Sequence, residues 1–363
     1  MLAGQNRVQP LSYFVKKMEE FSDDDLTTGE IPYRGQPLAT TDFSTGYMWG
    51  AYGYRWRNWF KHDQLEEAIS ILRTDRKTRR VVIEMWDSRD LHRVLKSPQC
   101  KDVPCNLLVM FRPRPSTETE RYHLGQVPSP REQRVLRPVI NSVEGYMEEG
   151  LEREDENAAG VTLLDMTVIN RSNDSLWGAL GSNYVHFSFL HEYIANSVGM
   201  AVGHYHQMTN NLHIYTSSAL TGEKRRDKQL WSGQWEPDSL CADNPNPYDD
   251  GYRHYPLFRC PVNDLDYINQ SQAAFDTACN ALFGNLSLIT LPDTQEWCSP
   301  FFQDVVQPML LAYAAHKKHN YAKAFQYASQ IIPMDWRLNC TEWLRRRSIR
   351  YTKASDGGAN AVS

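Results

Sequence analysis

The sequence lacks the features of a disulfide-stabilised, metal-stabilised or membrane-spanning protein. Its seven cysteines form no CxxC pair and no cysteine–histidine spacing typical of zinc; they stand at positions 100, 105, 241, 260, 279, 298 and 340. No apolar run approaches the roughly 20 residues that cross a bilayer, and no signal peptide precedes the first elements. We therefore expect reduced cysteines, no metal site and a cytoplasmic protein.

The charge balance excludes a general nucleic-acid binder. The 363 residues include 39 basic and 44 acidic side chains, for a net charge of -5, whereas proteins that bind nucleic acid generally rely on neutralising many phosphates. A free nucleotide needs only local arginines. With 41% hydrophobic and 23% charged residues, the chain has the composition of a large globular domain, here with an appended helical region.

Hydrophobic periodicity divides the chain into regions. We predict a catalytic core over 1–221 with an insertion at about 113–160, a loop or lid over 222–260, a helical region over 261–352 and a disordered tail over 353–363. The spacing predicts helices over 10–22, 63–73, 183–199, 268–283, 300–317, 319–331 and 335–348. Strands are predicted over 81–83, 107–111, 161–168 and 203–208. In the last strand His204 and His206 alternate without the further ligands that a metal site needs.

One cysteine stands out because of the residues around it. Cys105 follows Pro104 and precedes the apolar run 107–111, so it lies at the start of a predicted buried strand. A thiolate attacks where a thiol hardly does, and nearby positive charge lowers the pKa of a cysteine. Arg79, Arg80 and Arg171 are the candidate charges. The alternative is an inert core cysteine.

Five ordered blocks carry a resemblance to a known family. They read AYGYRWRNW at 51–59, DRKTRRVVIEMWD at 75–87, VPCN at 103–106, NRSNDSLWGALGSNYVHFSFL at 170–190 and NNLHIY at 210–215. With these blocks the chain resembles the thymidylate synthase superfamily, which includes phage deoxyuridylate and deoxycytidylate hydroxymethylases. The resemblance implies an α+β fold whose mixed β-sheet packs against helices and forms the interface of a homodimer.

The resemblance also implies roles for individual residues. It makes Cys105 the nucleophile, with Tyr52 near its sulfur and Asn106 in place of a family histidine. It places Asn183 at the base, where an amide suits uracil and the cytidylate enzymes usually carry aspartate. The remaining implied contacts are Arg79 and Arg80 from the partner subunit with Arg171 and Ser172 at the phosphate, His213 and Tyr215 at the sugar, and Asp174 and Gly178 at the folate.

The implied reaction is a one-carbon transfer from methylenetetrahydrofolate to carbon 5 of a pyrimidine nucleoside monophosphate. Cys105 adds to carbon 6, carbon 5 takes the one-carbon unit, and water completes a hydroxymethyl group. We found no counterpart of the apolar C-terminal segment with which thymidylate synthases exclude water, which favours hydroxymethylation of dUMP, or of dCMP, over methylation. A family glutamate would lie before Met1, so a catalytically impaired nucleotide-binding homologue is the third interpretation. A phage relative of this kind would act in the host cytoplasm.

Overall fold

The computed structural model describes residues 2, 48, 50–96, 102–117, 120, 161–213, 255–258, 264–284 and 297–359. The helix predicted over 10–22, nearly all of the lid predicted over 222–260, and Tyr215 lie outside these residues. Most of the insertion predicted over 113–160 lies outside them as well. Among the described residues, no helix is both long and apolar enough to cross a membrane.

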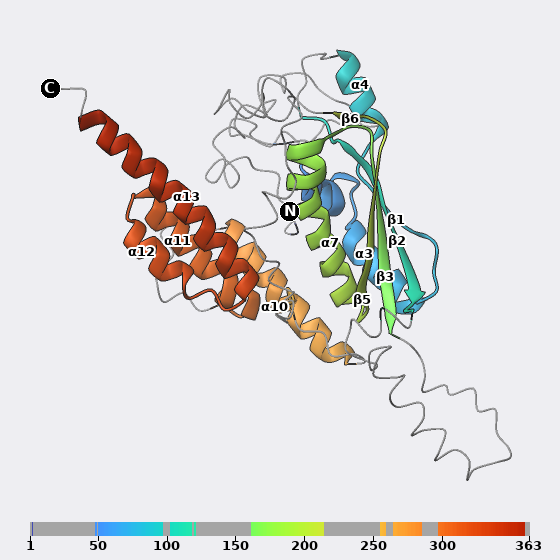
Figure 1. Cartoon of the computed structure of the whole chain (residues 1–363). Coiled ribbons are helices and arrows are strands. Elements are labelled where there is room, and N and C mark those ends of the chain that lie inside the picture. The colour runs from blue at the N-terminus through green and yellow to red at the C-terminus, as the bar shows by residue number, and fades with distance from the viewer. Residues whose placement is uncertain are drawn as a thin grey trace, which may run out of the picture.

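A four-stranded sheet in the order β1-β2-β3-β5 lies at one side of the molecule (Figure 1). Its strands are β1 (Val81–Glu84), β2 (Asn106–Pro115), β3 (Thr162–Asn170) and β5 (Ala201–Thr209). The pairs β1/β2 and β2/β3 are antiparallel and β3/β5 is parallel. The sheet is therefore mixed, as predicted, and all four predicted strands are present.

Helices cover one face of this sheet. The helices packed on it are η3 (Arg55–Trp59), α3 (Gln64–Thr74) and α7 (Asn183–Ser197). The short helices α2 (Tyr52–Tyr54) and η5 (Ser175–Ser182) adjoin η3 and α7, and α4 (Ser88–Lys96) lies beyond one end of the sheet (Figure 1). A short second sheet pairs β4 (Asn173–Asp174) with β6 (Leu212–His213). Parallel strands cannot be joined by a tight turn, and α7 is the helix between β3 and β5.

Helix α3 illustrates how the sequence sets a local structure. The Asp63 side chain accepts hydrogen bonds from the backbone N–H groups of Leu65 and Glu66, which caps the first turn. Its helically spaced apolar residues, Leu65, Ala68, Ile69 and Leu72, are all buried. The helix predicted over 63–73 is thus confirmed to within one residue.

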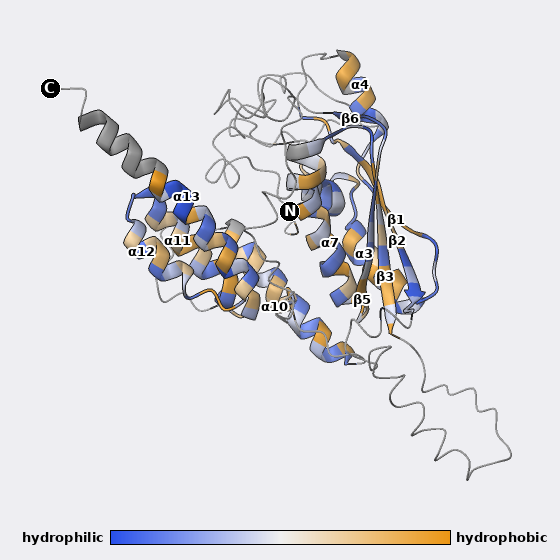
Figure 2. Ribbon diagram, in the orientation of Figure 1, coloured by the Kyte–Doolittle hydropathy of each residue, from blue (hydrophilic) through white to orange (hydrophobic). Residues whose placement is uncertain are grey.

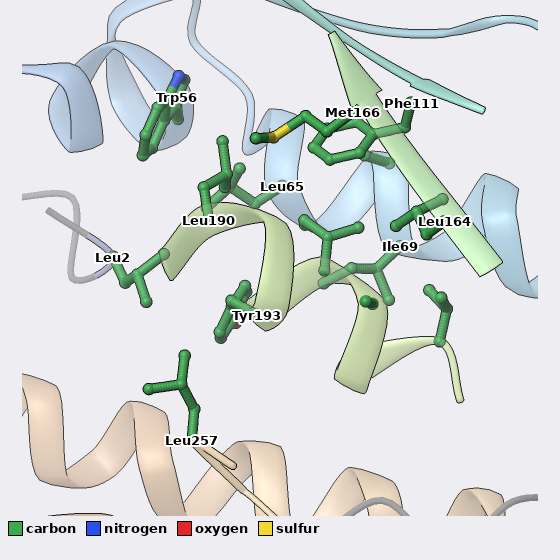
Figure 3. Packing of buried hydrophobic residues seen from close by; sticks show 14 of the residues in the cluster. Leu2, Trp56, Leu65, Ile69, Phe111, Leu164, Met166, Leu190, Tyr193 and Leu257 are labelled. Carbon is green, nitrogen blue, oxygen red and sulfur yellow. The ribbon is translucent and has the colours of Figure 1, made fainter. Parts of the chain in front are cut away.

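The hydrophobic core lies between the sheet and the helices. Leu164 and Met166 from β3 pack with Leu65 and Ile69 of α3 and with Leu190 of α7 (Figure 3). On the other side of α7, Tyr193 packs against Phe258 and Phe275, with ring centroids 5.9 Å and 6.1 Å away. One continuous core therefore joins the sheet layer to the C-terminal helices.

The C-terminal region is helical, as predicted. It contains α10 (Leu265–Gly284), η7 (Phe302–Val306), α11 (Gln307–Lys317), α12 (Tyr321–Ala328) and α13 (Met334–Ala359). Hydrophilic and hydrophobic residues alternate along α10 and α13, as in amphipathic helices (Figure 2). The last helix continues to Ala359, so residues 353–359 are helical where the sequence predicted disorder. No proline interrupts this stretch.

The second face of the main sheet has no described helix on it (Figure 1). Large apolar side chains project from it, with Val82 47% and Met208 59% exposed. Apolar strand faces are normally covered, because their burial is favourable. This face is therefore a candidate interface.

Candidate active site

The candidate site residues meet where three strands end. Asn106 begins β2 and is paired with Asn170, the last residue of β3, which in turn pairs with Thr209 of β5. Cys105 and Ser172 lie just beyond these ends, and β6 brings His213 alongside Asp174. The sheet thus collects blocks that are more than a hundred residues apart in the sequence.

Arg171 holds the segment that carries Cys105. Its backbone N–H donates to the Cys105 carbonyl at 2.9 Å. Its guanidinium donates to the carbonyls of Pro104 at 2.9 Å and Val103 at 3.2 Å, and it lies 5.4 Å from the Trp86 ring. The family resemblance implied only a phosphate contact for Arg171, so this tether is an additional role.

The thiol of Cys105 is half-buried. Burial raises its pKa above the ordinary value, while the positive charge of Arg171 acts in the opposite direction. We had expected the arginines to lower this pKa; in the single chain burial outweighs them. The thiol is therefore protonated at neutral pH before a ligand binds.

Tyr52 and Asn183 are in direct contact. The Tyr52 hydroxyl donates to Asn183 Oδ1 at 3.1 Å. Burial raises the pKa of Tyr52, and the nearby Cys105 raises it further. Tyr52 therefore stays neutral at physiological pH.

Asn106 lies behind the nucleophile rather than open to solvent. It is fully buried, and its Nδ2 donates to the Ile169 carbonyl at 3.0 Å and to Asn170 Oδ1 at 3.3 Å. Its Oδ1 has no partner among the described residues. The side chain clearly joins β2 to β3, whereas its catalytic role stays a prediction.

Other predicted residues gather around β4 and β6. Ser172 Oγ lies 3.5 Å from His213 Nδ1, consistent with one site for phosphate and sugar. Asp174 is buried. Gly178 packs against an asparagine, because an added Cβ would lie 2.0 Å from Asn173 Oδ1; its close approach to a cofactor stays a prediction.

Arg79 and Arg80 are not near Cys105 in the same chain. They are exposed and precede Val81, which pairs with Phe111 of β2. Phe111 is six residues beyond Cys105 in the sequence, a distance of about 20 Å along an extended strand. The two arginines cannot reach a phosphate held by Arg171 and Ser172 of their own chain.

The structure also reveals contacts that the sequence reading missed. The Gly50 N–H donates to Asp102 Oδ1 at 3.1 Å, which anchors the segment before Cys105. The His186 ring lies edge-on to Tyr52 with centroids 5.8 Å apart. Burial lowers the pKa of His186 to about 4, so its ring is neutral at physiological pH. The helical position of His186 gave no signal of this neighbour.

The two histidines of β5 have an acidic neighbour that the sequence did not indicate. One possible ligand atom from each of Asp165, His204 and His206 lies within 4.8 Å of the others. Asp165, however, pairs with Arg114 Nε at 2.7 Å and accepts the His204 backbone N–H at 2.8 Å. An arginine bound to the carboxylate opposes a second cation there, so the cluster is better described as an ion pair.

Comparison with known proteins agrees with this geometry. The family model described as thymidylate synthase matches residues 2–230. A protein of Pseudomonas phage M6 named deoxyuridylate hydroxymethyltransferase is 31% identical over 99% of this chain and 79% of its own length. Proteins of the same name from Bacillus phage SP01 and Delftia phage PhiW-14 are 26% and 24% identical, over 59% and 65% of this chain. The matches span 41% and 50% of those two relatives. The chain belongs to the thymidylate synthase family.

Proposed function

We propose that the chain is a folate-dependent pyrimidine nucleotide hydroxymethylase that acts on carbon 5 of dUMP. The observation that carries this proposal is the meeting of Cys105, Tyr52 and Asn183 at one end of the sheet. The similarity to phage deoxyuridylate hydroxymethyltransferases extends over nearly the whole chain and favours uracil and hydroxymethyl transfer.

The chain's own residues supply most of the chemistry. Cys105 loses its proton and adds to carbon 6 of the ring, which leaves carbon 5 nucleophilic. Methylenetetrahydrofolate, when bound, supplies the one-carbon unit that carbon 5 takes up. Tyr52, kept neutral by burial, holds a proton beside Cys105. Carbon 5 loses its proton, the donor leaves as tetrahydrofolate, and water adds to the transferred carbon. Elimination of Cys105 from carbon 6 then restores the ring.

The residues present fit a folate. Asp174 is a buried carboxylate beside η5 and can accept hydrogen bonds from the N–H groups of a pterin. Leu180 of η5 and Tyr184 of α7 are 78% and 51% exposed, and exposed apolar groups suit a flat aromatic ligand. These residues are candidates for holding the cofactor.

Product analysis tests the reaction. The protein is incubated with methylenetetrahydrofolate and either dUMP, dCMP, UMP or CMP, and the nucleotide products are identified by mass spectrometry. We expect a hydroxymethyl product from dUMP, with release of tetrahydrofolate. A methyl product with the absorbance rise of dihydrofolate would identify a methylating thymidylate synthase, and no tritium release from carbon 5 would indicate an impaired homologue.

We further propose that the active form is a homodimer joined through the uncovered sheet face. Val82 and Met208 on that face are exposed in the single chain. Arg79 and Arg80 lie too far from Cys105 to serve their own site, and each site would be complete only with a partner's arginines. Arginine binds phosphate oxygens in a planar fork, which suits this role.

Mixing two inactive variants tests this arrangement. A mixed dimer pairs a Cys105→Ala subunit with an Arg79→Ala/Arg80→Ala subunit. One of its two sites then carries both sets of substitutions, and the other site is intact. Random pairing should then restore about one quarter of wild-type activity. Each variant alone serves as its own control, and a mixture that stays inactive while forming mixed dimers would refute the shared site.

A further inference from the structure

Three uncharged side chains form a hydrogen-bonded series at the base end of the site. Tyr52 donates from its hydroxyl to Asn183 Oδ1 at 3.1 Å. Asn183 Nδ2 donates to Asn173 Oδ1 at 2.9 Å. Asn173 is 1% exposed and Asn183 9% exposed, so water cannot readily replace these bonds.

The three side chains alone do not determine which group donates and which accepts in each of these hydrogen bonds. An asparagine amide presents an acceptor and a donor of nearly equal size, and a tyrosine hydroxyl both donates and accepts. If both amides turned by 180°, every bond would be kept with donor and acceptor exchanged. A fixed neighbour at one end must therefore decide which way the series runs.

Gly178 is that neighbour. A Cβ built on Gly178 would lie 2.0 Å from Asn173 Oδ1, so the glycine hydrogen at this position points at the oxygen. A C–H group can form a weak hydrogen bond with a nearby oxygen. It repels an NH₂ group in the same place, because the hydrogens of both groups carry a partial positive charge. The Asn173 backbone is held as well, because its N–H donates to the Asn211 carbonyl at 2.8 Å.

The direction matters because the two pyrimidines present opposite patterns. Uracil offers an N–H donor at position 3 and an oxygen acceptor at position 4, whereas cytosine offers an acceptor and then a donor. A freely turning amide at position 183 would match either base, but an amide held in one orientation matches one base. The other base would leave buried polar groups unpaired.

We propose that Asn173 is a specificity-determining residue that holds the Asn183 amide in one orientation and so sets the choice between uracil and cytosine nucleotides. This inference rests on the proposed function, because it assumes that Asn183 contacts the base. Asn173 acts through Asn183 and is a positioning residue. Gly178 acts one step earlier, by orienting Asn173.

Direct binding measurements test the proposal without requiring turnover or folate. The dissociation constants of dUMP and dCMP are measured by calorimetry for the wild type, Asn173→Ala and Asn173→Asp. We expect a wild-type preference for dUMP that falls about tenfold in Asn173→Ala, where the Asn183 amide loses its fixed partner. Asn173→Asp should keep the preference, because it retains an oxygen towards Asn183 and lacks the competing amide donor.

Two controls separate this effect from a general loss of structure. Asn196→Ala removes another buried asparagine, whose Nδ2 donates to the Phe258 carbonyl at 3.4 Å, and should leave the ratio of the two constants unchanged. Gly178→Ala displaces Asn173 and should lower the ratio as Asn173→Ala does. The ratio of the two dissociation constants is the informative quantity, because a site that is only less stable would bind both nucleotides more weakly.

The remaining outcomes are decisive in different ways. An unchanged ratio in Asn173→Ala, an equal fall in Asn173→Asp, or a wild type that binds both nucleotides equally would overturn the role of Asn173 while nucleotide binding stands. A wild type that binds neither nucleotide would overturn the proposed function, and this inference with it.

Discussion

Replacing Cys105 with alanine is expected to lower kcat on the order of 10⁴-fold or more, because loss of a covalent nucleophile removes the whole reaction path. The variant should fold normally, since Cys105 is only half-buried and its neighbours are held through backbone carbonyls. Steady-state turnover of dUMP with methylenetetrahydrofolate is the measurement. Circular dichroism and dUMP binding show whether the site survives.

The matched control is Cys298→Ala. Cys298 is another free cysteine, in the C-terminal region, and its Sγ donates to the Ala274 carbonyl at 3.2 Å. It should keep wild-type turnover. Turnover that persists in Cys105→Ala, or is lost equally in Cys298→Ala, would rule out Cys105 as the nucleophile.

The same cysteine predicts a dependence on pH. Burial raises the pKa of Cys105, so below that pKa the thiolate fraction rises about tenfold for each pH unit. The value of kcat/KM for dUMP should therefore increase from neutral to alkaline pH and level off above the thiol pKa. A profile that falls as pH rises through this range would contradict a thiolate nucleophile.

The largest loss of stability is expected on replacing Arg55 with alanine. Arg55 is fully buried, and its two terminal nitrogens donate to the carboxylate of Asp90 at 2.8 Å and 2.6 Å. It also donates to the Met85 carbonyl at 3.3 Å and lies 4.0 Å from the Trp59 ring. Arg55→Ala would leave Asp90 charged and buried without its partner, which costs about 3–5 kcal/mol.

Urea unfolding measures this loss as a lower midpoint. Arg346→Ala is the control, because its pair with Glu342 is on the surface and should leave the midpoint almost unchanged. The double variant Arg55→Met/Asp90→Leu should recover most of the stability, since it removes both charges. If Arg55→Ala unfolds like the wild type, the pair does not hold η3 in place. Because η3 directly follows α2, which begins at Tyr52, that result would also weaken the proposed positioning of Tyr52.

The secondary structure could be predicted where the pattern of apolar residues was sufficient. Helix α3 and strand β1 follow from the spacing of Leu65, Ile69 and Leu72 and from the alternation of Val81 to Glu84. The end of α13 could not be predicted in this way. Polar and small residues make up most of the sequence after Tyr351, so the pattern there does not distinguish a solvent-exposed helix from a disordered tail.

The resemblance predicted the candidate site residues but not their contacts. It placed Cys105, Arg171 and Asn183 in one site, whereas the structure adds the tether from Arg171 to Pro104 and the bond from Asn183 to Asn173. It also paired Gly178 with a cofactor, and the structure packs Gly178 against Asn173. Such contacts depend on side-chain directions at strand and helix ends, which linear spacing does not specify.

The sequence by itself determined the family, the order of the main helices and strands, and the nucleophile to test, because these follow from motifs and periodicity along the chain. Only the tertiary structure decided that burial outweighs Arg171 at the thiol and that Asp165 lies beside His204. It also decided that Arg79 and Arg80 lie far from Cys105 of their own chain. The physical reason is that burial, electrostatic coupling and distance depend on how separate segments pack, and residues distant in sequence set all three.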